Sequence, residues 1–217
     1  MGYFITIEGG EGSGKTSVLE RVIERLKYDG YKNIVTSREP GGVKIATDIR
    51  KVILDKENTS MDPITEMFLF AASRRQHIVE KVLPSLKNNA IFICDRFVDS
   101  SYVYQGLAGN VGLETVIAAN EIATLGCMPD LTILFDLDPE IGLARINANK
   151  NREVNRLDLA GLEYHNKIRT GYQKIAKLFP ERIVVIDASK TFEEVVDNVY
   201  NLIKQKLEDV DYERIFN

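Results

Sequence analysis

The 217-residue chain contains no tryptophan, only two histidines and only two cysteines. Cys94 and Cys127 form no CxxC pair, which is typical of a protein kept in a reducing cytoplasm. So few cysteines and histidines argue against a zinc site built by the protein. The sequence also has no apolar run long enough to span a membrane, no signal-peptide pattern and no obvious linker, so we expect a single domain over residues 1–217.

Charge of one sign is not in excess either. The chain has 28 basic and 32 acidic residues, which gives a formal net charge of -4. This balance gives no sign of a nucleic-acid or membrane partner, although a local basic site remains compatible with it.

The most informative stretch is a glycine-rich segment near the N-terminus that reads G-x-x-x-x-G-K-T, the phosphate-binding loop pattern. An apolar, β-branched run over residues 3–8 precedes it, and apolar residues at helical spacing follow it. The loop therefore stands between a strand and a helix N-terminus, where main-chain N–H groups and the helix dipole attract anions. We expect Lys15 to hold the β- and γ-phosphates of a nucleotide and Thr16 to ligate Mg²⁺. The expected ATP-binding residues of the loop are Gly9, Gly10, Glu11, Gly12, Ser13, Gly14, Lys15 and Thr16.

Five apolar runs alternate with helical patterns along the chain. Because the runs are almost continuously apolar, they predict a parallel sheet covered by helices on both faces, an α/β fold. The predicted strands cover residues 3–8, 33–37, 90–94, 131–137 and 182–186, and the predicted helices cover 17–26, 43–54, 62–87, 113–125, 141–146, 159–178 and 191–207. The helix over 62–87 is expected to bend near 71–73 or at Pro84.

Charged residues follow two of the predicted strands. The second strand leads into Arg-Glu-Pro-Gly-Gly at 38–42, and the third leads into Asp95 and Arg96. In open α/β sheets this edge carries the ligands. An acid here commonly serves the Mg²⁺ shell in a phosphate-loop protein, which predicts that role for Asp95 and a phosphate contact for Arg96. A solvated turn is the alternative for residues 38–42.

Two further segments suit a nucleoside. Phe70 and Arg74 are four residues apart on one helix face, where a ring and a guanidinium can hold a flat base. A core phenylalanine beside a surface arginine is the alternative. Residues 98–106 are rich in hydroxyl and amide groups, including Ser101, Tyr104 and Gln105.

A polar, arginine-bearing segment over about 146–157 interrupts the helices of the C-terminal half. It reads either as a mobile lid or as a solvated loop. The candidate phosphate-binding arginines are Arg145, which directly precedes this segment, and Arg152 and Arg156 within it, and the sequence does not choose among them.

Taken together, these motifs resemble the thymidylate kinase family. The resemblance rests on the phosphate loop with its strand, Arg-Glu-Pro-Gly-Gly at 38–42, Phe-Ala-Ala-Ser-Arg at 70–74, Asp-Arg-Phe at 95–97 and the segment 100–106. It extends to Asn-Arg-Leu-Asp at 155–158 and Gly-Tyr at 171–172, so it covers essentially the whole chain in order. It implies the nucleoside monophosphate kinase fold with strand order 2-3-1-4-5, transfer of the γ-phosphate of ATP to dTMP with Mg²⁺, and a homodimer.

The resemblance also implies roles for individual residues. Phe70 would stack on thymine, with Arg74 and Gln105 at its polar edge and Tyr104 near the sugar. Lys15, Arg96, Arg152 and Arg156 are the expected catalytic residues, and Arg145 is expected to contact ATP. The expected contacts to dTMP are Glu39, Arg50, Phe70, Arg74, Arg96, Ser101, Tyr104 and Gln105. Thr16 and Asp95 are the expected metal ligands.

Two other functions remain open at this point. A phosphate-loop switch that hydrolyses nucleotide slowly would need neither the second phosphate site nor the base-binding residues. A kinase for another deoxynucleotide or for a deoxynucleoside is the nearer alternative, and an enzyme acting on an unphosphorylated sugar would not need both Arg50 and Arg96.

Overall fold

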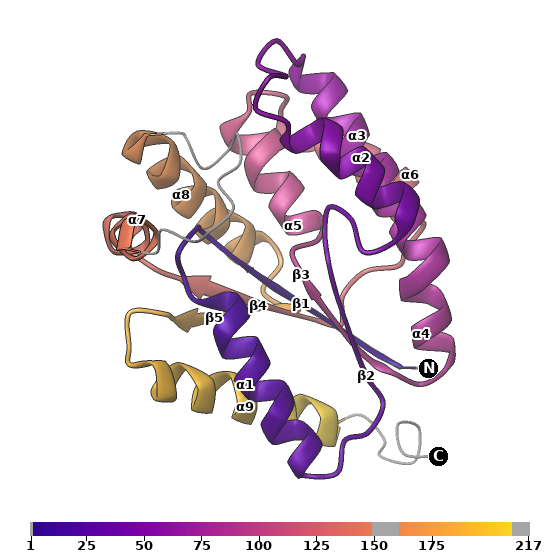
Figure 1. Cartoon of the computed structure of the whole chain (residues 1–217), viewed down its shortest axis with the longest axis vertical. Helices are drawn as coiled ribbons and strands as arrows, with labels where there is room; N and C mark the ends of the chain where they lie inside the picture. Colours follow the sequence, from indigo (N-terminus) through magenta and orange to yellow (C-terminus); the bar gives the residue numbers. More distant parts are fainter. Residues whose placement is uncertain (1, 149–160, 210–217) are drawn as a thin grey trace.

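The five apolar runs form one parallel sheet in the order β2-β3-β1-β4-β5 (Figure 1). The strands are β1 (Tyr3–Gly9), β2 (Ile34–Arg38), β3 (Ile91–Asp95), β4 (Leu131–Asp136) and β5 (Ile183–Asp187). The structure, a computed structural model, describes residues 2–148 and 161–209. It confirms the parallel α/β sheet, its strand order and all five predicted strands, with ends that differ by at most one residue.

Helices cover both faces of the sheet. The helical segments are α1 (Lys15–Tyr28), α2 (Lys44–Leu54), α3 (Pro63–His77), α4 (Leu83–Lys87), α5 (Val98–Ser101), α6 (Leu113–Thr124), α7 (Pro139–Ala148), α8 (Leu162–Leu178) and α9 (Phe192–Asp209), with π-helical segments at η1 (Ile78–Val82) and η2 (Tyr102–Ala108). Helices α1 and α9 lie on one face, and the group from α2 to α6 together with α8 lies on the other (Figure 1).

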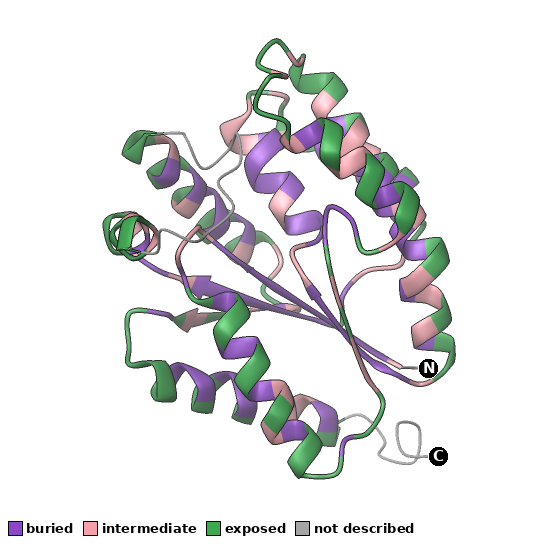
Figure 2. Cartoon of the chain, viewed as in Figure 1, coloured by how far each residue is buried: buried purple, intermediate pink, exposed green. Residues whose placement is uncertain are grey.

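The core consists of two apolar layers separated by the sheet. Successive residues of a strand point to opposite faces, so Ile5 and Ile7 of β1 pack toward α1 and α9, while Phe4 packs against Phe92 and Phe97 in the other layer. All seven residues of β1 are buried, as Figure 2 shows for the centre of the sheet. This explains why the central strands read as continuous apolar runs.

The long helical region after Asp62 begins as the sequence predicts. The Asp62 carboxylate accepts hydrogen bonds from the N–H groups of Ile64 and Thr65, and Pro63 occupies the first helical position. Residues 71–73, the first of the two expected bend positions, lie within α3. The irregularity comes at η1, where the N–H of Leu83 donates to the carbonyl of Ile78. This wider turn directly precedes Pro84, which has no N–H to donate.

The strands β1, β2 and β3 are neighbours in the sheet, and their carboxyl ends lie at the same edge. Parallel registration aligns Asp95 at the end of β3 with Arg38 of β2 and Ile7 of β1. The loops that follow β1, β2 and β3 are therefore neighbours. Among the described residues, no helix is both long and apolar enough to cross a bilayer.

Candidate functional site

The loop after β1 is prepared for an anion. No side chain of the described residues caps the N-terminus of α1, and the first turn of α1 contains no acidic residue, so its N–H groups can bind an anionic ligand. Lys15 is 8% exposed, and its Nζ donates to the carbonyls of Gly9 (3.0 Å) and Gly10 (2.8 Å) and to Ser13 Oγ (3.2 Å). A phosphate oxygen that binds Lys15 would replace one of these acceptors.

The charge on Lys15 is poorly solvated. Burial, and then the positive charge of Arg96, lower its pKa to about 8, while Glu11 and Asp95 act in the opposite direction. The ammonium group is thus poised near neutrality for an anionic ligand that favours its charged form.

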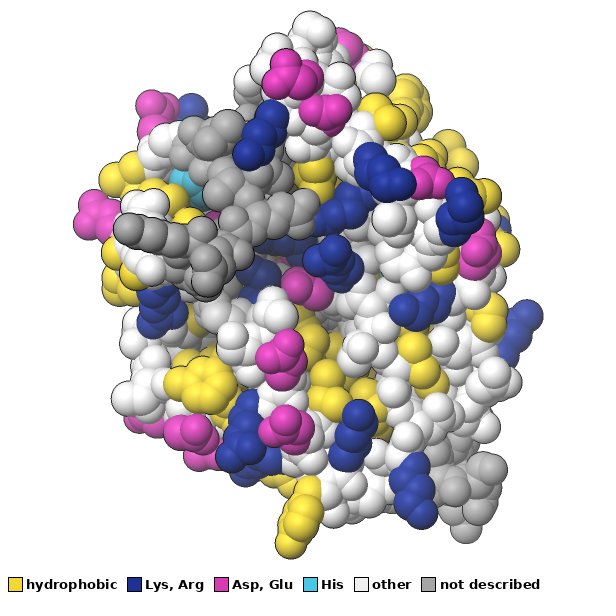
Figure 3. All heavy atoms as spheres, in the orientation of Figure 1, with side chains coloured by type: hydrophobic (Ala, Val, Ile, Leu, Met, Phe, Trp, Pro, Cys, Tyr) yellow, Lys and Arg dark blue, Asp and Glu magenta, His cyan; other side chains and the backbone are white. Residues whose placement is uncertain are grey.

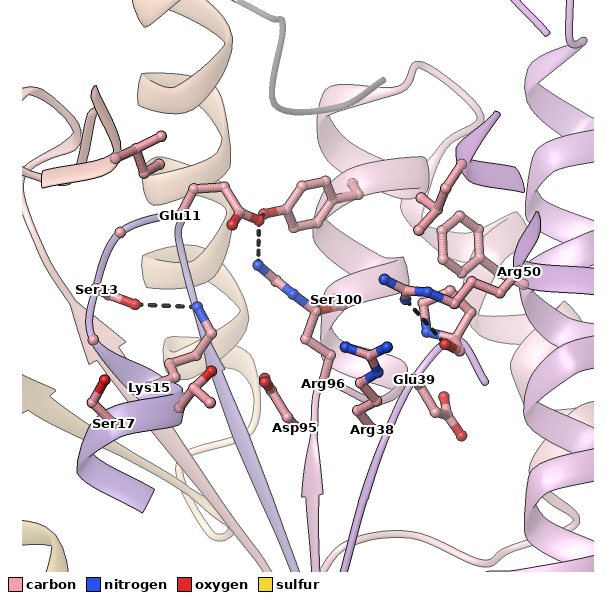
Figure 4. A pocket seen from close by; sticks show the side chains of 18 of the residues that line it. Glu11, Ser13, Lys15, Ser17, Arg38, Glu39, Arg50, Asp95, Arg96 and Ser100 are labelled. Carbon is pink, nitrogen blue, oxygen red and sulfur yellow. Dashed lines mark hydrogen bonds and ion pairs between the residues drawn. The ribbon is translucent and has the colours of Figure 1, made fainter. Parts of the chain in front are cut away.

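Three arginines form the opposite side of the site. Arg38 ends β2, Arg50 lies on α2 and Arg96 follows β3, and Figure 4 shows their guanidinium groups directed into one region. Asp95 lies between this group and Lys15 in the same view. Arg50 Nη1 donates to the Pro40 carbonyl at 3.1 Å. Lysine and arginine side chains gather around the middle of this face of the molecule (Figure 3).

Arg96 is held in an unusual conformation. Its φ of 68° is rare for a residue with a side chain, and its N–H donates to the Ile7 carbonyl at 2.9 Å. Its guanidinium donates to Glu11 at 2.5 Å, to Ser100 Oγ at 3.2 Å and to the Tyr172 hydroxyl at 3.1 Å. Such strain persists only where the surroundings fix it, and it is concentrated at functional sites.

Glu8 is the buried support beneath Arg96. Its carboxylate accepts from the Phe97 N–H (2.7 Å), Ser100 Oγ (2.6 Å) and the Tyr172 hydroxyl (2.8 Å). Burial, followed by the charge of Asp99, raises the pKa of Glu8 to about 7. The end of β1 thus fixes the loop that carries Arg96, and Tyr172 joins α8 to it.

A second buried network surrounds Arg74. This side chain, 1% exposed, donates to Glu39 (2.8 Å), Ser101 Oγ (3.1 Å), the Phe97 carbonyl (3.0 Å) and the side-chain oxygen of Asn120. The other carboxylate oxygen of Glu39 accepts from His77 Nδ1 at 2.9 Å. Arg74 therefore ties α3 to the loop after β2, to α5 and to α6.

Asp95 has a buried oxygen that is unpaired within the part of the chain that the structure describes. Its Oδ1 has no hydrogen-bond partner there. A buried carboxylate oxygen without a partner costs free energy unless a cation or water satisfies it. Asp95 and the hydroxyl of Thr16 provide the oxygen ligands that Mg²⁺ prefers, so the residues fit this ion.

Lys15, Asp95 and the three arginines line one cavity of about 560 Å³. This volume is in the range of a small-molecule site. The lining residues are Glu11, Gly12, Ser13, Gly14, Lys15, Thr16, Ser17, Arg38, Glu39, Pro40, Arg50, Leu54, Phe70, Asp95, Arg96, Ser100, Tyr104, Gln105, Arg145 and Ile146.

Comparison with known proteins decides the family. The family model described as thymidylate kinase matches residues 7–199. The thymidylate kinase of Halalkalibacterium halodurans is 52% identical over 206 residues, which cover 95% of this chain and 98% of the relative. That of Bacillus velezensis is 50% identical over 209 residues, covering 96% and 98%. The crystal structure of thymidylate kinase from Ehrlichia chaffeensis aligns with a TM-score of 0.74 and 29% identity, over 94% of this chain and 98% of that one.

The chain belongs to the thymidylate kinase family. The resemblance found from the motifs is thereby confirmed.

The structure brings most of the expected thymidylate kinase site residues to the cavity. The expected residues that line it are Glu11, Gly12, Ser13, Gly14, Lys15, Thr16, Glu39, Arg50, Phe70, Asp95, Arg96, Tyr104, Gln105 and Arg145. Four others, Gly9, Gly10, Arg74 and Ser101, are absent from the lining, and Arg74 and Ser101 are hydrogen-bonded to each other behind it. Arg152 and Arg156 lie outside the described residues, as does most of the lid expected over 146–157.

The motif reasoning assigned no role to several residues of this site. Arg38 stands in the expected loop, yet its place between Arg50 and Arg96 depends on the strand register. Glu8 could have been found, because an acidic residue in an otherwise apolar strand must have partners. Tyr172 belongs to the Gly-Tyr pair of the resemblance, but its position in the sequence fits a core residue equally well, so no role was assigned to it.

The depressed pKa of Lys15 predicts that nucleotide binding takes up protons. The phosphates favour the charged form, so the pKa rises in the complex above its value of about 8 in the free protein. By linkage, ATP affinity is expected to fall as pH rises above 8, by up to about tenfold per pH unit. Calorimetry in buffers of different ionisation enthalpy measures the uptake directly. An affinity independent of pH between 7.5 and 9.5 would contradict this assignment.

The phosphate loop also packs directly on α7. A Cβ added at Gly12, whose φ is +71°, would lie 2.2 Å from the Gly142 carbonyl oxygen, and one at Gly142 would lie 2.4 Å from the Glu11 carbonyl oxygen. Helix propensity alone would make Gly142→Ala stabilising by about 1 kcal/mol. We expect the opposite, a lower melting temperature and an ATP KM raised about tenfold or more, because α7 must move off the loop. Gly161→Ala, with no atom of the described residues within 4 Å of the added Cβ, is the control.

Proposed function

We propose that this protein transfers the γ-phosphate of ATP directly to the 5′-phosphate of dTMP, giving ADP and dTDP. One observation carries the proposal: a single cavity has a phosphate loop with Lys15 on one side and the arginine group Arg38, Arg50 and Arg96 on the other. A nucleotide hydrolase needs only the first of these, whereas a kinase acting on a nucleoside monophosphate needs both. Membership of the thymidylate kinase family supports dTMP as the acceptor.

The mechanism follows from the placement of charge. An oxygen of the dTMP phosphate attacks the γ-phosphorus, and the bond from that phosphorus to the bridging oxygen of ADP breaks. The attacking phosphate is already anionic, so no strong base is needed. Lys15 and the N–H groups of α1 hold the donor phosphates, while Arg96 and Arg50 hold the acceptor.

Mg²⁺, when bound, would neutralise charge on the ATP phosphates. Thr16 and Asp95 would hold it, and the buried, unpaired Oδ1 of Asp95 within the described chain supports that placement. Arginines of the 146–157 segment, with Arg145 at the end of α7, would then cover the transferring group and exclude water.

The acceptor nucleoside is proposed to occupy the same cavity. Phe70 and Gln105 line it beside Tyr104, which gives a ring for stacking, an amide for hydrogen bonding and a phenol near the sugar. The base would lie against Phe70. Arg74 lies behind this wall, where its guanidinium donates hydrogen bonds to Glu39 and Ser101. It would act on the base through these two residues, or directly if base binding moves the guanidinium into the cavity.

A panel of acceptors tests the proposal. ADP release is measured with dTMP, dUMP, dCMP, dGMP, AMP and thymidine, each with Mg²⁺-ATP. We expect dTMP to be the preferred acceptor and thymidine to be inactive, because the arginine group needs a phosphate. Comparable turnover without any acceptor would indicate the hydrolytic switch, and faster turnover with thymidine would indicate a deoxynucleoside kinase.

We further propose that the protein is a cytoplasmic homodimer formed through α2, α3 and α6. These helices pack against one another and carry exposed apolar side chains, among them Ile45, Phe68 and Ile122, which are 50%, 60% and 76% exposed. Exposed apolar groups of this size, clustered on neighbouring helices, indicate an interface. The free thiols of Cys94 and Cys127 are compatible with a reducing compartment. Phe68→Asp should convert a dimer to a monomer in sedimentation equilibrium, and a monomeric wild-type protein would contradict the proposal.

A further inference from the structure

The side chain of Gln105 lines the cavity and is held by a hydrogen bond to a carboxylate. It lies on η2, is 2% exposed and lines the cavity together with Phe70 of α3. Glu66 and Phe70 are one helical turn apart on α3, so they share a face of that helix. The amide of Gln105 therefore lines the cavity, and the Glu66 carboxylate lies next to that amide without lining the cavity itself.

The hydrogen bond between these two groups has only one possible direction. Gln105 Nε2 donates to Glu66 Oε1 at 2.8 Å. An ionised carboxylate has acceptors and no donor, whereas an amide has one end that donates and one that accepts. Glu66 therefore fixes the amide with its NH₂ toward α3 and its carbonyl away from it. Within residues 2–148 and 161–209, the side-chain hydrogen bond of Gln105 is this one from its Nε2, and its Oε1 is left for a ligand.

We infer that Glu66 determines base specificity by holding the Gln105 carbonyl toward the bound base, so that the site selects a ring edge that offers an N–H. This rests on the proposed function and assigns a positioning role to Glu66. Thymine and uracil have one such donor on the ring, at N3. Cytosine has an unprotonated N3, whose lone pair would face the lone pairs of Oε1.

Without the carboxylate, the selection is lost. In Glu66→Gln, both side chains are amides, and the pair can turn over together while keeping its mutual hydrogen bond. Gln105 could then present its NH₂ to N3 of cytosine at little cost. The affinity for dCMP is expected to rise toward that for dTMP, because an unpaired or repelling polar contact is replaced by a hydrogen bond.

The test is a set of dissociation constants measured by calorimetry for dTMP, dUMP and dCMP. In Glu66→Gln, the ratio of the dCMP to the dTMP constant should fall about tenfold or more, while the ratio of dUMP to dTMP stays within about twofold. The second ratio is the internal control, since uracil keeps the N3–H. Glu80→Gln is the matched variant, because Glu80 accepts a hydrogen bond from the Gln76 amide at an exposed position of the neighbouring helical segment. It should leave both ratios unchanged.

A swapped pair provides the rescue. In the double variant Glu66→Gln with Gln105→Glu, the amide at 66 donates to the carboxylate at 105, whose second oxygen again faces the base as an acceptor. The wild-type dCMP to dTMP ratio should return. Should Glu66→Gln fail to fold, Gln105→Met, which has no strong acceptor, should show the same fall in the ratio.

Two results would overturn the inference. One is an unchanged dCMP to dTMP ratio in Glu66→Gln, and the other is an equal loss of affinity for all three nucleotides, which would show a purely structural role. If the proposed function itself were wrong, the result would differ from both of these: the wild-type protein would then bind dTMP no better than dCMP.

Discussion

Replacing Lys15 by alanine should reduce the kcat of dTMP phosphorylation by about 10²–10³-fold. The reason is the position of its ammonium group, which lies against the Gly9 and Gly10 carbonyls at the N-terminus of α1, where the donor phosphates are proposed to bind. The fold should survive, because desolvation already disfavours the charged side chain and lowers its pKa to about 8. Steady-state kinetics and a melting curve measure the two effects.

Lys44→Ala is the control for this experiment. Lys44 is exposed and forms an ion pair with Asp48 at 2.9 Å, so its loss should change neither kcat nor the melting temperature appreciably. The Lys15→Ala variant should also lose the proton uptake that accompanies ATP binding. A variant with wild-type kcat would remove Lys15 from the mechanism.

Replacing Arg74 by alanine should have the second large effect, first on stability. The change leaves the Glu39 carboxylate buried, at 4% exposure, with His77 as its remaining side-chain partner. Removing one member of a buried ion pair costs about 3–5 kcal/mol, which should appear in the free energy of unfolding by urea. Glu39 and the Phe97 carbonyl both lose their hydrogen bond from Arg74, and both lie on the proposed acceptor side of the site. The affinity for dTMP should therefore fall much more than the affinity for ATP.

Arg75→Ala is the matched control, one residue along the same helix. Arg75 is half-buried and donates one long hydrogen bond, 3.4 Å, to the Ala123 carbonyl, so its removal should cost less than 1 kcal/mol. If Arg74→Ala weakened ATP and dTMP equally, the network would serve the whole protein and not the acceptor side.

The sequence predicts the sheet well because buried parallel strands leave a direct signal. A run such as β1 is apolar along most of its length. The glycine-rich loop after it is characteristic of one structural context, the turn between a strand and a helix. The widened turns at η1 and η2 leave no comparable signal, since an i→i+5 turn changes the helical period only locally. Residues 98–101 and η2 thus form a helical segment that composition does not predict.

The sequence predicts which face of a helix a site residue occupies. It does not predict whether the side chain lines the cavity or is buried behind the cavity wall. The four-residue spacing places Phe70 and Arg74 on one side of α3, yet only Phe70 lines the cavity, while Arg74 is buried behind it. Arg38 enters the site through strand register, which spacing along the chain does not contain. The same holds for the bond between Glu66 and Gln105, whose partners are 39 residues apart.

The central claim is that the two anion-binding groups in this cavity hold donor and acceptor phosphates at the same time, close enough for direct transfer. A compound with five phosphates joining the 5′ oxygens of adenosine and thymidine tests this, because it can occupy both sides only if they are adjacent. Calorimetry should show one molecule bound per chain, at least about 10²-fold more tightly than ATP or dTMP, with most of that gain lost in Lys15→Ala and in Arg96→Ala. Affinity no better than that of ATP alone would contradict the account.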